Sequence, residues 1–179
     1  MKKEDIKRHL TIYSIFDKRS TTINHAFASA IAPSVNYDEK IINEALEFLG
    51  QNPNEDLKCI FCEKEAETWD HLTGLVKNKV LRGFGHQIGN LVPCCKECNS
   101  KKGSKEFEQF INETGQNNSD LINRLQQYQN KFAKIIDLEY LKQINPIEFE
   151  EYYQIKKEIF ELMKKADKIA EKLRKQVIK

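Results

Sequence analysis

The chain has 179 residues, of which 40% are hydrophobic and 31% are charged, with a formal net charge of +2. This composition predicts a soluble globular protein with one domain, or one small core with helical extensions. No apolar run approaches the roughly 18 residues of a membrane span, and the first residues do not resemble a signal peptide, so we expect neither a span nor export. Five cysteines spaced for a metal rather than for disulfides indicate the cytoplasm.

The first 50 residues predict helices. Apolar residues recur at helical spacing from Ile6 onward, and Pro33 is expected to stop the second of these helices. A third helix is expected over residues 38–49, with Gly50 as its C-terminal cap. We therefore expect an N-terminal helical region over residues 1–52.

Residues 58–103 contain all five cysteines. Two Cys-x-x-Cys pairs a few tens of residues apart are typical of a tetrahedral four-cysteine zinc site, because each short turn presents two thiolates about 2.3 Å from the metal. One such pair alone would also suit a redox motif or two buried thiols. Using Cys94 as a ligand would place three residues between two ligands, so we expect it to be a small buried hydrophobic residue. The expected zinc ligands are Cys59, Cys62, Cys95 and Cys98.

Residues suited to chemistry lie beside these cysteines. Asp70 offers an oxygen ligand for a hard cation, and His71 offers an imidazole whose ordinary pKa of about 6.5 suits a general base. If the last cysteine pair opens a helix, Asn99 and Lys102 share one of its faces, so an amide oxygen and a cation would point the same way. This combination indicates phosphodiester hydrolysis. The neighbouring Trp69 is expected to pack in the core beneath the strand of His71.

The order of these motifs over residues 59–102 is Cys-x-x-Cys, Asp-His, Asn-Leu, Cys-x-x-Cys-Asn and Lys. It resembles the HNH (ββα-metal) nuclease family, in the subset with two zinc knuckles, and is similar in layout to HNH restriction endonucleases. The resemblance covers about a quarter of the chain. It implies a β-hairpin that carries the catalytic base, followed by a helix that carries the last metal ligand, with residues 74–89 between the two strands.

By this resemblance, His71 would be the base that activates water for attack on a phosphorus atom. Asp70 and Asn99 would hold a single catalytic cation, Mg²⁺ or Mn²⁺, separate from the structural zinc. Asn90 would orient the His71 ring or brace the loop. The last position of the motif is often His in the family and is Asn99 here, which leaves the identity of the metal open.

A local excess of positive charge accompanies these motifs. Between Lys77 and Lys105 the sequence has seven Lys or Arg and one acid, Glu97, so this segment carries +6. Such a face would attract double-stranded DNA, and an ordinary solvated surface is the alternative. His86 has two readings: contact with a phosphate or the leaving oxygen, or a structural hydrogen bond across the hairpin. The candidate DNA contacts are Arg82, His86, Lys101 and Lys102.

The last third of the chain predicts further helices. A short helix capped by Ser104 and a second one from Leu121 to Ile135 are expected, and Asn145 followed by Pro146 predicts the start of a long helix that continues to the C-terminus. An apolar stripe at steps of three and four runs along this last helix. We expect it to pack within the chain, with a homodimer as the alternative. The stripe comprises Ile159, Met163, Ala166, Ala170, Leu173 and Val177.

The sequence thus predicts an α+β, mostly helical chain. A zinc-stapled ββα-metal core over residues 53–106 is flanked by the N-terminal helical region and by a C-terminal helical region over residues 107–179. By resemblance, the function is a divalent-metal-dependent DNA endonuclease of a restriction or other defence system. The alternative is a non-catalytic, zinc-stabilised module that binds nucleic acid or a protein partner.

Overall fold

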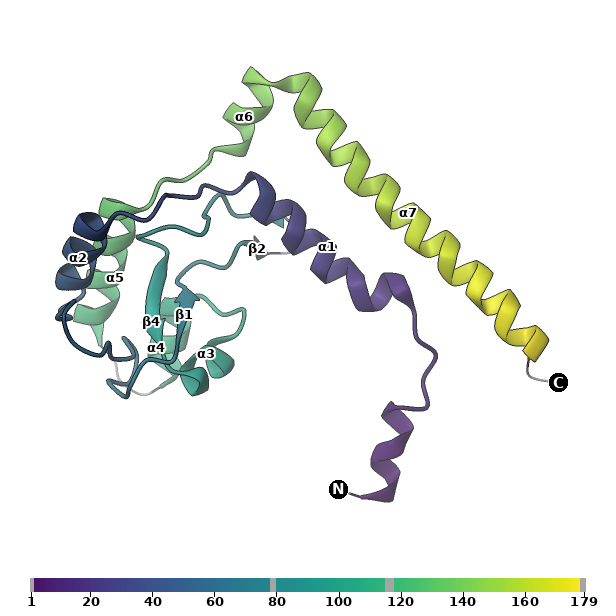
Figure 1. Cartoon of the computed structure of the whole chain (residues 1–179), viewed down its shortest axis with the longest axis horizontal. Coiled ribbons are helices and arrows are strands. Elements are labelled where there is room, and N and C mark those ends of the chain that lie inside the picture. Colours follow the sequence, from purple (N-terminus) through teal and green to yellow (C-terminus); the bar gives the residue numbers. More distant parts are fainter. Residues whose placement is uncertain (1, 78–79, 115–117, 178–179) are drawn as a thin grey trace. The chain divides into compact units, whose positions relative to one another are not determined.

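The chain forms two compact units (Figure 1). The computed structural model describes residues 2–77, 80–114 and 118–177. Unit 1 joins Met1–Phe27 to Tyr140–Lys179, and unit 2 is Ala28–Glu139. Segments from the two ends of the chain therefore pack against each other in unit 1.

The described residues are mostly helical. The helices are η1 (Lys3–Arg8, a 3-10 helix), α1 (Ile15–Ile31), α2 (Glu39–Phe48), α3 (Lys96–Lys102), α4 (Phe107–Glu113), α5 (Ser119–Phe132), α6 (Leu138–Ile144) and α7 (Pro146–Val177). The strands are β1 (Thr68–His71), β2 (Val76–Lys77), β3 (Val80–Leu81) and β4 (Leu91–Cys94). Among the described helices, none combines the length and apolar character that crossing a bilayer requires.

Several helix ends agree with the sequence-based expectations. Helix α2 begins after Asp38, whose carboxylate accepts a hydrogen bond from the Ile41 N–H, and it is followed by Gly50 at φ +79°. Helix α7 begins at Pro146, as predicted. Helix α4 differs, since its N-terminal cap position is Glu106 and not Ser104. Helix α6 was not expected.

The small sheet of unit 2 is an antiparallel pair of β1 and β4. Its register pairs Asp70 with Val92 and His71 with Leu91. Because side chains alternate between the two faces of a strand, burial of Asp70 turns its neighbour Trp69 to the other face, where it is 48% exposed. The expectation that Trp69 packs in the core was therefore wrong. Strands β2 and β3 form a separate ladder within the segment that joins β1 to β4.

The main core of unit 2 lies between this sheet and helices α2, α4 and α5. The Tyr128 hydroxyl on α5 donates a hydrogen bond to the Leu91 carbonyl over 2.8 Å. Gly89 makes a close approach to the end of α5, since a Cβ there would lie 2.3 Å from the Ala133 nitrogen. These contacts position the start of β4 against α5. The buried core residues include Leu49, Phe61, Leu72, Val92, Phe107, Phe110, Ile111 and Leu125.

Unit 1 is built on contacts between α1 and α7. The rings of Phe16 and Phe160 meet edge to face with centroids 5.7 Å apart, and the Tyr152 hydroxyl donates to the Phe27 carbonyl over 2.8 Å. The Asp167 carboxylate accepts hydrogen bonds from the first backbone N–H groups of α1 and from the hydroxyl of Ser14. A side chain of α7 therefore caps α1, and the two helices run antiparallel.

Candidate functional site

Four cysteines of unit 2 form a cluster that can hold a metal ion such as zinc. The Sγ atoms of Cys59, Cys62, Cys95 and Cys98 all lie within 4.8 Å of one another, and those of Cys62 and Cys95 are 3.7 Å apart. A tetrahedral zinc site with Zn–S bonds of about 2.3 Å needs sulfur atoms roughly 3.8 Å apart. The structure thus brings together the four predicted thiol groups.

Local backbone geometry explains why both pairs present their thiols to one point. In the first pair, the N–H groups of Cys62 and Glu63 donate to the Cys59 carbonyl over 3.3 and 2.9 Å, and Glu63 closes the turn at φ +61°. In the second pair, Cys95 caps helix α3 and its Sγ accepts a hydrogen bond from the Cys98 N–H over 3.4 Å. The Ile60 N–H donates to a β4 carbonyl over 3.0 Å and so ties the first turn to the second.

Cys94 lies beside the cluster but is not one of its four members. It is fully buried, its Sγ is 4.0 Å from that of Cys59, and it donates to the Cys95 carbonyl over 3.3 Å. Cys94 is therefore a buried thiol beside the cluster, as the spacing of the cysteines predicted.

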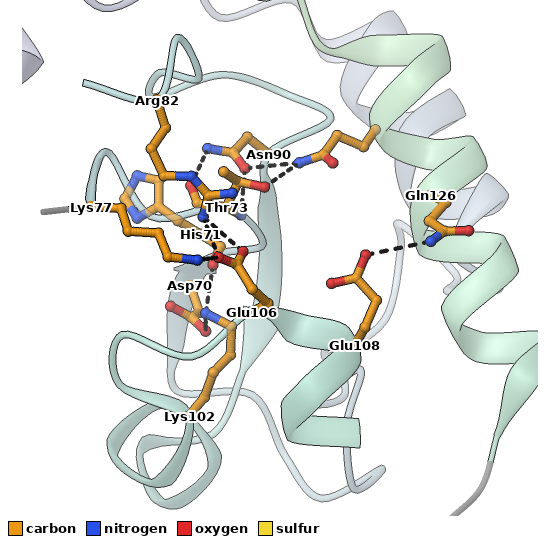
Figure 2. Close-up of polar contacts among 11 residues, drawn as sticks. Asp70, His71, Thr73, Lys77, Arg82, Asn90, Lys102, Glu106, Glu108 and Gln126 are labelled. Atoms are coloured by element: carbon orange, nitrogen blue, oxygen red, sulfur yellow. Dashed lines mark hydrogen bonds and ion pairs between the residues drawn. The ribbon is translucent and has the colours of Figure 1, made fainter. Parts of the chain in front are cut away.

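Asp70 and Lys102 meet in the interior next to the hairpin. The Lys102 side chain is 2% exposed, its Nζ lies 3.0 Å from the Asp70 Oδ2, and it donates to the His71 carbonyl over 2.7 Å (Figure 2). Apart from this ion pair, the buried Oδ2 has no hydrogen-bond partner among the described residues. Lys102, expected to contact DNA, instead balances the charge of Asp70.

Asn99 lies one turn before Lys102 on α3 and is partly exposed. The sequence places the two residues on one face, but only Lys102 is buried against the hairpin. Among the described residues, no hydrogen bond or ion pair joins the Asn99 side chain to Asp70 or to His71. The expectation that Asp70 and Asn99 share a cation stays a prediction.

His71 and His86 form a pair of imidazole rings. The His71 Nε2 and the His86 Nδ1 are 2.9 Å apart, and the other ring nitrogen of His86 is 3.4 Å from the Ser29 hydroxyl. Burial, with a smaller contribution from His86, lowers the pKa of His71 below its ordinary value. His71 is thus neutral at neutral pH, and of the two readings for His86 the structure contains the hydrogen bond.

Close backbone packing positions His86. A Cβ at Gly85 would lie 1.8 Å from the Pro33 carbonyl oxygen, so only glycine allows the chain to pass there. The next residue, His86, forms a bridge with Ser34. The segment after α1 therefore fixes the place of the His86 imidazole.

Asn90 braces the segment between β1 and β4. Its fully buried amide oxygen accepts from the Thr73 N–H over 2.9 Å, and its amide nitrogen donates to the carbonyls of Thr73 and Gly85 over 3.0 Å. Gln129 of α5 also donates to the Asn90 oxygen, over 3.3 Å. Of the two roles expected for Asn90, these contacts match the bracing of the loop, and among the described residues none joins it to the His71 ring.

Ion pairs neutralise most of the basic segment. Arg82 and Lys77 both bind Glu106, each with an N–O distance of 2.7 Å, and Lys101 binds Glu97 over the same distance. The acids come mainly from outside the segment whose charge was counted, so the expected excess of +6 does not describe the surface. Lys79, the seventh basic residue, lies outside the described residues. The remaining pairs are Lys96 with Glu67, Lys102 with Asp70 and Lys105 with Glu113.

The hairpin, helix α3 and the intervening segment thus gather a carboxylate, two imidazoles and a buried lysine beside the cysteine cluster. Glu106 and Ser29 belong to this region and were not expected from the sequence. Glu106 lies one residue beyond the segment whose charge was counted, and Ser29 has no sequence signal at all. Compared with known proteins, the chain matches no family model, no curated protein and no solved structure.

Proposed function

We propose that unit 2 is a divalent-metal-dependent DNA endonuclease of the HNH type, in which zinc bound to the cysteine cluster stabilises the fold. The observation that carries the proposal is that β1 places the Asp70 carboxylate close enough to the His71 imidazole to act on its charge. Asp70 offers a buried carboxylate whose Oδ2 is paired with Lys102, and His71 offers an imidazole that burial keeps neutral. A role in a restriction or other defence system is part of this proposal through the sequence resemblance alone.

His71 is the general base of the proposed reaction. A neutral imidazole can accept a proton from water at neutral pH, and the low pKa of His71 ensures this form. Its Nε2 is now within hydrogen-bond distance of His86. A water molecule that replaces His86 as the partner of Nε2 would be the nucleophile, and His86 would then be free to contact a phosphate oxygen.

Asp70 is the proposed ligand of the catalytic cation, Mg²⁺ or Mn²⁺. Its carboxylate is the hard oxygen donor that such ions prefer, and in this structure its Oδ2 already faces the positive charge of Lys102. A divalent cation at this point would stabilise negative charge on the attacked phosphate. Asn99 is the second proposed protein ligand. Lys102 has to yield part of its ion pair with Asp70 when the site is loaded.

A plasmid assay tests this function. Supercoiled DNA is incubated with the zinc-loaded protein, with and without added Mg²⁺ or Mn²⁺, and nicked and linear products are measured. We expect cleavage only with the added cation, and His71→Ala is expected to abolish it while zinc content and the circular dichroism spectrum stay unchanged. The matched control is His25→Ala, which removes an exposed histidine of unit 1. If the plasmid stays uncleaved with Mg²⁺ and also with Mn²⁺, the proposed nuclease activity is wrong. If His71→Ala still cleaves the plasmid, His71 is not the base.

A non-catalytic, zinc-stabilised nucleic-acid-binding module is the second candidate. One observation favours it: Lys102 already neutralises Asp70, so the fold is electrostatically complete without a second cation. In that case a DNA fragment would shift in a gel with zinc-loaded protein and stay intact with Mg²⁺. His71→Ala would then leave binding unchanged.

A further inference from the structure

Helix α7 carries a second apolar stripe in addition to the side that packs on α1. Ile155, Leu162 and Ile169 follow one another at intervals of seven residues, and Leu173 comes one turn later. All four are exposed within the chain, Leu162 by 62%. At 3.6 residues per turn, an interval of seven keeps side chains nearly in line along a helix. The side that meets α1, which includes Phe160, points elsewhere. We call these four residues the outer stripe.

Charged residues flank the outer stripe with the same period. Glu151 and Glu158 lie beside its first half, and Lys165 and Lys172 lie beside its second half, all of them exposed. The rest of α7 has the same polarity. Its first sixteen residues contain five glutamates and two lysines, and its last sixteen contain six basic and two acidic residues. The exposed side of α7 is therefore acidic at one end and basic at the other.

We propose that the outer stripe is the interface between two copies of this chain, with their α7 helices antiparallel about a two-fold axis at Leu162. In this register Leu162 meets Leu162 of the second copy, and Ile155 meets Ile169. The same register sets Glu158 beside Lys165 of the second copy. Glu151 likewise lies beside Lys172, so the alignment that pairs the apolar residues also pairs opposite charges.

The charge pattern selects the antiparallel arrangement. A parallel, in-register pair would bring Glu158 next to Glu158 and Lys165 next to Lys165, and such like-charge contacts oppose association. The outer stripe is also self-complementary, as a two-fold interface requires, because its first half is flanked by glutamates and its second half by lysines. From Ile155 to Leu173 the helix extends about 27 Å at 1.5 Å per residue. The second copy is therefore the occupant that matches both the apolar and the charged residues.

Sedimentation equilibrium of the full chain between 1 and about 100 μM tests the interface. We expect a dimer for the natural sequence, and at least about a hundredfold weaker association for Leu162→Glu, because two buried carboxylates would face each other across the axis. Leu10→Glu is the matched control, since Leu10 is a 75% exposed leucine outside the stripe. A natural chain that stays monomeric over this concentration range overturns the proposal. That outcome includes the case in which another part of the same chain covers the outer stripe. An unchanged dimer of Leu162→Glu overturns it too.

A charge exchange tests the register. Glu158→Lys puts like charges together at two symmetric places and should weaken the dimer about fivefold, because each exposed pair contributes a few tenths of a kcal/mol. Adding Lys165→Glu to the same chain should restore the association. If the double variant Glu158→Lys with Lys165→Glu associates as weakly as Glu158→Lys alone, the proposed pairing of residues 158 and 165 is wrong.

Oxidative cross-linking tests the direction of the helices. Leu162→Cys should form a disulfide with its own copy, because the axis passes through this position. Ile155→Cys should not, because its neighbour is Ile169 of the second copy. The natural chain with its five cysteines gives the background. Efficient cross-linking of Ile155→Cys would show parallel helices and overturn the proposed arrangement.

Discussion

Unit 2 is stabilised by short elements packed around a buried apolar core, whereas unit 1 is stabilised by contacts between two long helices. In unit 2, strands β1 and β4 have four residues each, and cysteines, a buried ion pair and the buried amide of Asn90 fix their ends. In unit 1, aromatic contacts between α1 and α7 and the cap from Asp167 join the two helices. Such a small sheet has little apolar surface to bury, so metal binding and buried polar groups become structural. Three predictions test this difference.

The largest effect is expected from loss of the metal. Cys98→Ala should remove zinc and unfold unit 2, because metal binding in such sites contributes about 10 kcal/mol or more to folding. Cys94→Ala is the matched control and should keep one zinc per chain, since Cys94 is outside the cluster of four. Zinc is measured by mass spectrometry and unit 2 by fluorescence of Trp69. Much of the helical circular dichroism should remain, because unit 1 has no such cluster among its described residues. An equal loss of zinc in both variants would contradict the assignment of Cys94.

A smaller effect is expected at the buried ion pair. Lys102→Met leaves the Asp70 carboxylate buried without its cation, which should cost unit 2 about 3 to 5 kcal/mol. The double variant Asp70→Asn with Lys102→Met removes the orphaned charge, and it should recover part of this loss. Urea unfolding followed by Trp69 fluorescence measures both. If Lys102→Met unfolds at the same urea concentration as the natural chain, the pair is not structural.

The smallest effect is expected in unit 1. Hydrogen bonds from the backbone of α1 lower the pKa of Asp167. A lowered pKa in the folded state means that this contribution is complete above the pKa of the unfolded chain, about 3.9, and is lost as the pH falls through the folded value. Asp167→Ala should therefore lower the thermal midpoint of unit 1 slightly at pH 7, and the difference from the natural chain should shrink as the pH falls below about 3.9. Glu171→Gln, a change on the same helix, is the control.

Local sequence patterns predicted part of the candidate site but not the contacts between its elements. The spacing of Cys59 and Cys62, and of Cys95 and Cys98, predicted the cluster because a short turn places two thiols by itself. The roles of Arg82 and Lys102 were harder to predict, since their partners come from other elements. Glu106 lies one residue beyond the segment whose charge was counted. Asp70 lies on β1, and no sequence pattern predicts that β1 packs against α3.

The amino-acid sequence by itself determined the thiol cluster, the start of α7 at Pro146 and the limits of α2, because these depend on turn geometry and caps within a few residues. Tertiary structure alone decided that Trp69 is exposed, that His86 meets His71 and that the described cations of residues 77–105 form ion pairs. These outcomes depend on which distant side chain comes within a few ångströms. Neighbouring residues specify turns, but contacts between distant residues follow from how the whole unit packs its surfaces.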